Sequence, residues 1–200
     1  TEALKEALAE RGLNYKINPG DGAFYGPKID FHLKDCLDRT WQCGTIQLDF
    51  QMPEKFDLTY IGEDGEKHRP VVIHRVVYGS IERFIALLTE HYAGAFPVWL
   101  APVQARILPI SDRHEGYAEE VKNLLKENKI RVEVDTRREK INYKVRESQT
   151  EKIPFALVVG DKEAEEKTVS VRRYGQKQTQ TMSLEEFAKM LKEMIENKTI

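Results

Sequence analysis

The feature that most constrains the fold is a change of sequence pattern near residue 103. Between Phe24 and Ile73, short β-rich runs follow one another and are separated only by turn sequences such as Gly26-Pro27 and Asp64-Gly65. Strands joined by short links pair antiparallel, because a parallel pair needs a long crossover. After Val103, strand-like runs alternate with helical segments, which is typical of a mixed, mostly parallel sheet covered by helices. The chain therefore combines an α+β part with an α/β part.

The two parts are predicted to meet at the stiff segment Pro97–Pro102, which gives domains at residues 1–103 and 104–200. In the first domain we expect helices at about 3–12 and 80–92 and strands at 29–33, 45–50, 58–61 and 70–74. In the second we expect strands at 105–110, 130–135, 155–159 and 168–172 and helices that begin near 111, 139 and 183. The last helix opens with the capping box Ser183–Glu186.

Composition excludes several classes of protein. No apolar run approaches the roughly 20 residues that a membrane helix needs. The two cysteines, Cys36 and Cys43, are too few for a disulfide framework, which favours a reducing cytoplasm. The start shows no signal-peptide pattern and no Met, so an excised piece of a longer protein is expected.

Charge is distributed unevenly although the net charge is only −2. The second part contains a basic run, Arg137–Arg146, with five basic residues and one acidic residue. This run is either a solvated helix face or a surface that contacts the phosphate groups of a nucleic acid.

Two segments of the first part could carry chemistry, and each also has a structural interpretation. His74 follows the apolar run Val71–Ile73, so it is either a hydrogen-bonded edge residue or a metal ligand. The sequence Gly79-Ser80 opens a helix whose first turn holds Arg83, which suits an anion but also fits a capped helix with a surface ion pair. Cys43 has no base beside it in sequence, so a nucleophile is not indicated.

Taken together and in order, these segments resemble the threonyl-tRNA synthetases, a family of class II aminoacyl-tRNA synthetases. The matching stretches are GAFYGPKID at 22–30, WQCGTIQLDF at 41–50, VIHR at 72–75 and GSIERF at 79–84. PVWLAPVQ at 97–104 resembles that family's junction into its anticodon-binding domain, and REKI at 138–141 and VGDKE at 159–163 continue the match. The resemblance covers nearly all of residues 20–175.

The resemblance implies an activation site in the first domain. It assigns Arg83 to the γ-phosphate of ATP, as in motif 3 of class II synthetases, and His74 to one coordination position of a zinc ion that binds threonine. A zinc ion that requires a hydroxyl ligand would reject valine, which an apolar pocket separates poorly from threonine. His74 and Arg83 should then project into one cleft. The remaining residues implied for the threonine and adenylate pocket are Tyr25, Gln42 (also toward the nucleotide), Cys43, Gln47 and, with a catalytic role, Lys28.

In the second domain the resemblance implies an anticodon-binding surface formed by Glu163, Arg172 and Arg138. Single-stranded bases are recognised by stacking and by hydrogen bonds to their edges, which a carboxylate and a guanidinium can supply. Many relatives have Asn where this chain has Arg138, so the chain departs from the family's pattern at this position and a base-specific role does not carry over to it directly.

The implied activity is a threonine–tRNA ligase that uses ATP, Mg²⁺ and Zn²⁺, works as a cytoplasmic homodimer and needs no membrane. The family's other two zinc ligands, its motifs 1 and 2 and its editing domain lie upstream of the matched stretch, so these 200 residues alone are expected to be catalytically incomplete. Two alternatives remain at this point: a tRNA anticodon-binding module without catalysis, and a related class II synthetase of the prolyl, glycyl or histidyl type.

Overall fold

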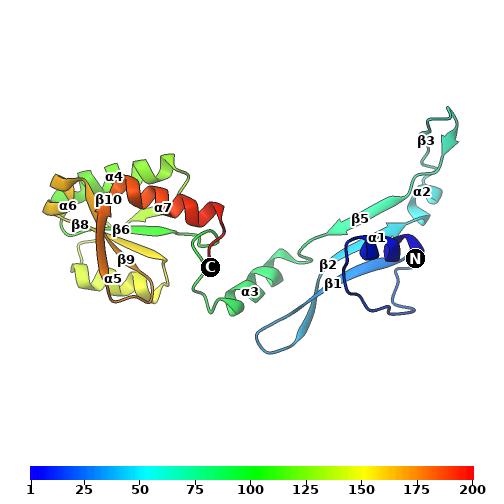
Figure 1. The fold of residues 1–200 in the computed structure, drawn as a ribbon, viewed down its shortest axis with the longest axis horizontal. Helices are drawn as coiled ribbons and strands as arrows, with labels where there is room; N and C mark the ends of the chain where they lie inside the picture. The colour runs from blue at the N-terminus through cyan, green and yellow to red at the C-terminus, as the bar shows by residue number, and fades with distance from the viewer. The chain divides into compact units, whose positions relative to one another are not determined.

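The computed structural model describes all 200 residues, which form two compact units, Thr1–His91 and Tyr92–Ile200 (Figure 1). The predicted domain limit at residue 103 lies further along the chain, so the proline-bounded segment before it belongs to the second compact unit. None of the helices has the length and apolar character needed to cross a bilayer.

The first unit is built on an antiparallel three-stranded sheet with the strand order β1-β2-β5. These strands are Lys28–Lys34 (β1), Thr40–Asp49 (β2) and Val72–Val76 (β5). The other elements are the helices Glu2–Glu10 (α1), Gln51–Lys55 (α2) and Ile81–His91 (α3) and the two-residue strands Tyr60–Ile61 (β3) and Lys67–His68 (β4). The antiparallel sheet predicted from the short links is confirmed for β1, β2 and β5, whereas the strand expected at 58–61 pairs with β4 in a separate two-stranded sheet.

The two faces of this sheet differ in chemistry. One face carries apolar side chains, and three of them remain largely exposed: Phe31 is 43%, Leu33 45% and Ile73 63% exposed. Because side chains alternate along a strand, the residues between them point to the other face. That second face is mostly polar, although Val72 and Val76 also lie on it, and it contains most of the site residues predicted for this unit.

The second unit is an α/β sandwich on a mixed five-stranded sheet with the order β10-β9-β8-β6-β7. The strands are Ala105–Pro109 (β6), Val132–Val134 (β7), Phe155–Val159 (β8), Thr168–Arg173 (β9) and Thr179–Ser183 (β10). β6 pairs parallel with β7 and β8, whereas β9 and β10 are antiparallel additions. The sheet is therefore mixed, as expected, and its parallel part is limited to β7, β6 and β8.

Helices cover both faces of this sheet (Figure 1). Helices Glu115–Glu127 (α4) and Leu184–Glu196 (α7) pack on one face around a core that includes Ile107, Leu157 and Phe187. Helix Ile141–Thr150 (α5) packs on the other face against Leu108 and Ala156. The alternation of Ile107 and Leu108 between the two cores is the period of two expected for a strand buried on both sides.

The sequence patterns located most elements and missed four. The short helices α2 and Asp161–Glu166 (α6) and the strands β4 and β10 were not expected. They are short or polar, so they lack the periodic apolar pattern on which such predictions depend. The capping box at Ser183 is confirmed, because the Ser183 hydroxyl accepts a hydrogen bond from the Glu186 backbone N–H.

Candidate functional site

The polar face of the first unit is assembled by strand register. Gln47 of β2 lies directly between Lys28 of β1 and His74 of β5. Two positions along, Asp30 lies opposite Thr45. Directly opposed residues of an antiparallel pair share a face, so these five side chains are neighbours.

Tyr25 reaches this face from the loop before β1. Its hydroxyl donates a 2.6 Å hydrogen bond to Gln47 Oε1, and its ring lies 5.7 Å from the His74 ring in an edge-on arrangement. The approach requires Gly26, since a Cβ there would lie 2.1 Å from the backbone oxygen of Leu48. The structure thus brings together Tyr25, Gln47 and His74, three of the predicted site residues.

Lys28 and Gln42 meet at Asp30, a residue that the sequence analysis did not select. The Lys28 ammonium lies 2.7 Å from Asp30, and Gln42 Nε2 donates a 2.7 Å hydrogen bond to the same carboxylate. The hydrogen bond to Asp30 is the largest cause that raises the pKa of Lys28. Gln42 shares this face because β2 has an extra residue, Cys43, opposite the step from Phe31 to His32 in β1.

His74 has a carboxylate partner, Asp49, which was also not predicted. His74 Nε2 lies 2.9 Å from Asp49 Oδ2, and Asp49 is only 2% exposed. Asp49 Oδ1 accepts hydrogen bonds from the backbone N–H groups of Gln51 and Met52. The N–H of Met52 and then His74 hold the pKa of Asp49 below its usual range.

Cys43 and Thr45 complete the centre of this region. Cys43 is buried at the bulge, and its thiol forms no hydrogen bond. The Thr45 hydroxyl is buried without a hydrogen-bond partner. A buried polar atom without a partner is uncommon in a folded protein, so this hydroxyl is available to a ligand or a water molecule.

Arg83 does not lie on the polar face, so the expected cleft shared with His74 is not formed in this structure. Its guanidinium carbon is 5.5 Å from the centre of the Trp41 ring. Trp41 precedes Gln42 on β2, so the two side chains leave opposite faces of the sheet. A cation–π contact at an exposed site is worth about 0.5–1 kcal/mol, which an anionic ligand could outcompete.

Arg83 lies in the first turn of a capped helix, which is the structural alternative that the sequence left open for this segment. The Ser80 hydroxyl accepts a 3.4 Å hydrogen bond from the Arg83 backbone N–H and donates one to Glu82. Gly79 has a φ of +69°, and a Cβ there would lie 2.7 Å from the Cys43 backbone oxygen. A glycine is therefore required where this turn crosses β2.

The chain supplies too few ligands for a metal ion by itself. It contains no group of three or more His, Cys, Asp or Glu side chains arranged to hold one. Zinc sites use three or four protein ligands, and His74 offers a single ring nitrogen. The residues present therefore do not form a complete metal site.

In the second unit, Glu163 stands at the start of α6 with both carboxylate oxygens engaged. Oε2 accepts the Gly160 backbone N–H at 3.0 Å, and Oε1 accepts the Ser170 hydroxyl at 2.7 Å. Glu163 thus stabilises the local fold in addition to any contact with a ligand.

Arg172 lies two residues after Ser170 on β9 and so points to the same face, the one covered by α5. Its Nε donates a 3.0 Å hydrogen bond to Thr179 on β10, and its terminal N–H groups make no hydrogen bond. Arg172 lines an open hollow of about 370 Å³ together with Gln149, Gly175, Gln176 and Lys177. The structure therefore places Glu163 and Arg172 on one surface.

The basic run around α5 is less basic at the surface than its sequence suggested. Lys144 is 3% exposed and donates to the backbone oxygens of Pro109 and Asp135, so it is a structural residue. Arg137 pairs with Asp135 and Glu147. The interpretation as a continuous solvated basic face is wrong for these two residues.

Arg138 remains at the surface of the second unit, where its guanidinium lies 3.1 Å from Asp112. No contact joins it to Glu163 or Arg172, so its anticodon role stays a prediction.

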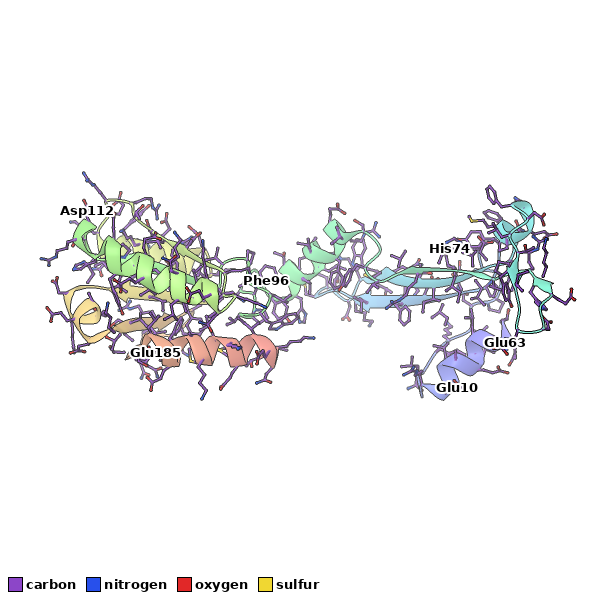
Figure 2. All side chains as sticks on the ribbon, turned by 90° about the horizontal axis from the view of Figure 1, so that it is seen from above. Glu10, Glu63, His74, Phe96, Asp112 and Glu185 are labelled. Atoms are coloured by element: carbon purple, nitrogen blue, oxygen red, sulfur yellow. The ribbon has the colours of Figure 1, made fainter.

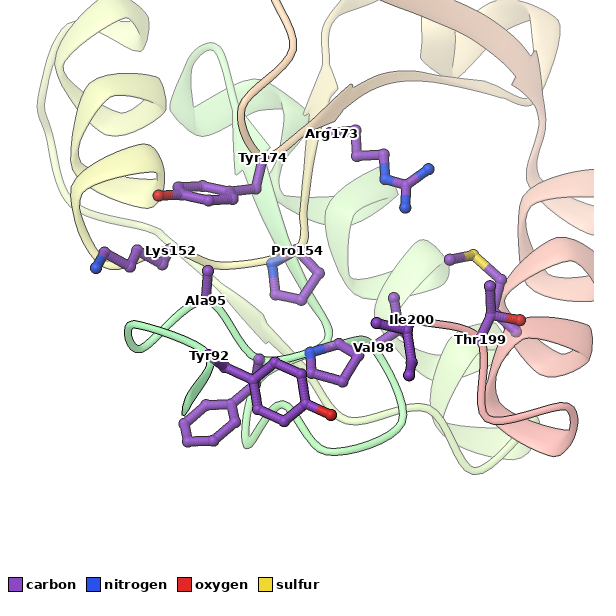
Figure 3. A pocket seen from close by; sticks show the side chains of 12 residues that line it. Tyr92, Ala95, Val98, Lys152, Pro154, Arg173, Tyr174, Thr199 and Ile200 are labelled. Atoms are coloured by element: carbon purple, nitrogen blue, oxygen red, sulfur yellow. The ribbon is translucent and has the colours of Figure 1, made fainter. Parts of the chain in front are cut away.

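A separate cavity of about 180 Å³ lies in the second unit between the segment after Tyr92 and the end of α7. Figure 3 shows the side chains of Val98, Pro154 and Ile200 around it. None of the predicted site residues lines this cavity.

Comparisons with known proteins agree with this division into two parts. Residues 2–92 match the tRNA synthetase class II core domain (G, H, P, S and T), and residues 104–194 match an anticodon binding domain. Together these matches identify the chain as part of a class II aminoacyl-tRNA synthetase.

Similar proteins narrow the class to one family. A threonine–tRNA ligase of Clostridium novyi is 65% identical over 199 residues, and one of Carboxydothermus hydrogenoformans is 70% identical over 175 residues. These matches cover 100% and 88% of this chain but only 31% and 28% of the relatives, so the chain spans about a third of their length. The structure described as the RNA binding domain of threonyl-tRNA synthetase from Cryptosporidium parvum Iowa II superposes with a TM-score of 0.87 at 43% identity, covering 96% of this chain and 49% of that one. The chain belongs to the threonyl-tRNA synthetase family.

Proposed function

We propose that this chain is the part of a threonine–tRNA ligase that completes the activation site and binds the anticodon. The complete enzyme activates threonine with ATP to threonyl-adenylate and transfers it to the 3′ end of threonine tRNA. The observation that supports this most is the polar face on which Tyr25, Gln47 and His74 meet, in a chain up to 70% identical to threonine–tRNA ligases. The prolyl, glycyl and histidyl types are not favoured, because the similar curated proteins are threonine ligases.

On the polar face, the proposed role of the side chains is to hold threonine and its adenylate. Gln47 Oε1 accepts the hydrogen bond from the Tyr25 hydroxyl, so Gln47 presents Nε2 as a donor to a carbonyl or carboxylate. Gln42 gives its Nε2 to Asp30 and so presents Oε1 as an acceptor. Lys28, neutralised in part by Asp30, supplies a cation near the phosphate end of the adenylate.

Arg83 is proposed to bind the phosphates of ATP after leaving the Trp41 ring. Positive charge at this place offsets the charge that develops on the phosphates during activation, a task shared with the Mg²⁺ that accompanies ATP. The guanidinium is on an exposed side chain at the start of α3, so it can change rotamer without unfolding the helix.

Zinc is proposed only for the complete enzyme, with His74 as the single ligand from this chain. When bound, a zinc ion supplies a Lewis-acid position that distinguishes a hydroxyl from a methyl group. The other ligands, and the second subunit of a homodimer, would come from outside these 200 residues.

The second unit is proposed to bind the anticodon loop of threonine tRNA through the surface of Glu163 and Arg172. The terminal N–H groups of Arg172 can donate to base carbonyl oxygens. Arg138 and Arg146 would contact the phosphate backbone nearby. A cytoplasmic location follows from this role in protein synthesis.

The experiment that tests the proposal separates binding from catalysis on the 200-residue chain. We expect calorimetry to detect binding of a threonine anticodon stem-loop, and ATP–pyrophosphate exchange to show no dependence on threonine. A catalytically silent chain that also fails to bind the stem-loop would refute the assignment of the second unit. Robust threonine-dependent exchange would refute the claim that the activation site is incomplete.

A further inference from the structure

Asp49 fixes the position and the hydrogen-bonding state of His74. It ends β2 directly beside the residue pair Gln47 and His74, and it is almost fully buried. One carboxylate oxygen accepts two backbone N–H groups, those of Gln51 and Met52, each at 2.9 Å. These donors belong to the start of α2, so the carboxylate cannot rotate without breaking the helix start.

The second oxygen of this carboxylate then determines which nitrogen of His74 carries the proton. An ionised carboxylate only accepts hydrogen bonds, so His74 Nε2, at 2.9 Å, has to donate. A neutral imidazole has one N–H group, which leaves Nδ1 with its lone pair. No hydrogen bond in the structure involves Nδ1.

We propose that Asp49 is a positioning residue that holds His74 as the Nε2–H tautomer, so that Nδ1 is the atom this face offers to its ligand. Tyr25 supports the same geometry, since its ring packs edge-on against the imidazole at 5.7 Å. The ligand is an electron-pair acceptor, either a metal ion or an N–H or O–H donor of the substrate. This last step rests on the proposed function, whereas the tautomer does not.

The tautomer is testable by long-range ¹H–¹⁵N NMR of the labelled 200-residue chain near neutral pH. In the unchanged protein we expect a pyrrole-type nitrogen at His74 Nε2 and a pyridine-type nitrogen at Nδ1. Asp49→Asn should reverse this pattern. The Asn oxygen would keep the two backbone donors, its NH₂ group would face Nε2, and the ring would have to accept there and carry its proton on Nδ1.

Two other His–Asp pairs serve as controls in the same spectrum. His68 lies 2.8 Å from Asp64 in the first unit, and His114 lies 3.0 Å from Asp161 in the second. Their signals should not change in Asp49→Asn if the variant is folded. A pyrrole-type Nδ1 in the unchanged protein would overturn the proposal, as would an unchanged His74 pattern in Asp49→Asn with the His68 signals intact. If the variant unfolds, the unchanged protein alone decides.

A kinetic arm separates this inference from the proposed function. In the longer enzyme that contains this chain, Asp49→Asn should lower kcat/KM for threonine by about 10–100-fold, the usual effect of losing a partner that orients a ligand residue. The KM for ATP should not change. A reversed tautomer with unaltered threonine activation would confirm the role of Asp49 in positioning His74 and refute the use of Nδ1 by the ligand.

Discussion

The most informative substitution in the second unit is Arg172→Ala, because it removes a proposed base contact at little cost to the fold. The only hydrogen bond that the structure gives the Arg172 side chain joins Nε to Thr179 at 3.0 Å, and Thr179 is exposed. Losing such a bond should lower the free energy of unfolding by at most about 0.5–1 kcal/mol. Losing the contact of the terminal N–H groups with a base should weaken anticodon binding by about 1–3 kcal/mol, a magnitude taken from base contacts in DNA.

The assay is calorimetric titration of the chain with a threonine anticodon stem-loop at fixed salt, since phosphate contacts make affinity depend strongly on salt. The dissociation constant should rise about 5- to 150-fold in Arg172→Ala. Lys192→Ala is the control: it also removes one positive charge, but from the exposed side of α7, on the opposite face of the sheet. Equal losses in both variants would show that general charge, not a base contact, explains the binding, and no loss in Arg172→Ala would remove this residue from the site.

Three further predictions follow from single contacts. Glu163→Ala should destabilise the second unit by about 1–2 kcal/mol in thermal unfolding, because Gly160 and Ser170 both lose an acceptor. Glu163→Gln should lose less stability than Glu163→Ala. Equal stability of Glu163→Ala and the unchanged protein would contradict the structural role of the Glu163 carboxylate. Gly26→Ala should accelerate amide hydrogen exchange at Leu48 and Phe50, whose N–H groups donate to Pro27 and Tyr25, because the new Cβ collides with the Leu48 oxygen. Gly22→Ala is the control and should leave these exchange rates unchanged, because its Cβ would make only an ordinary 3.5 Å contact. Equal exchange rates in the two variants would contradict the collision. Burial raises the pKa of Tyr117 from 10.0 to about 12, so the contribution of the protonated phenol to stability is complete below pH 10 and is lost as the pH rises toward 12. Tyr117→Phe should therefore flatten the decrease in Tm of the second unit at alkaline pH. An unchanged slope of Tm against pH would refute Tyr117 as the cause of that decrease.

The residues that meet on the polar face were expected from the family resemblance, and the period of two of a strand explains why they meet there. In the folded chain, Gln47 of β2 pairs directly with His74 of β5, so both side chains leave the same face of the sheet. The bulge at Cys43 has no comparable signal, yet it decides that Gln42 joins the same face as Asp30.

The carboxylates Asp30 and Asp49 were missed for a different reason. Both lie in stretches that match the family, but a single Asp in a strand carries no periodic signal that marks it as a site residue, and their partners Gln42 and His74 are 12 and 25 residues away in sequence. For Asp49 a local signal did exist: an Asp two and three residues before Gln51 and Met52 can accept their N–H groups at the start of a helix. The five-residue helix α2 is too short to show a helical period, so the sequence pattern does not reveal the helix start that Asp49 caps.

Side-chain orientation limited the prediction for Arg83 and for the basic run. The position of Arg83 in the chain was correct for the first turn of α3, but its contact with Trp41 depends on a rotamer that no sequence pattern specifies. Lys144 looked exposed because lysine usually is, whereas here the ammonium satisfies two buried backbone oxygens at the ends of β6 and β7. Long-range partners of this kind become visible only in the folded chain.

The central claim is that this chain can complete a threonine–tRNA ligase, and a replacement experiment tests it most directly. The matching 31% of the Clostridium novyi enzyme would be exchanged for these 200 residues, which are 65% identical to it. Charging of threonine tRNA by the purified, folded chimera is the measurement. We predict that the chimera charges this tRNA with threonine and loses the activity when His74 or Arg83 is changed to Ala; a folded chimera that charges no tRNA, or one unaffected by either change, would contradict the account.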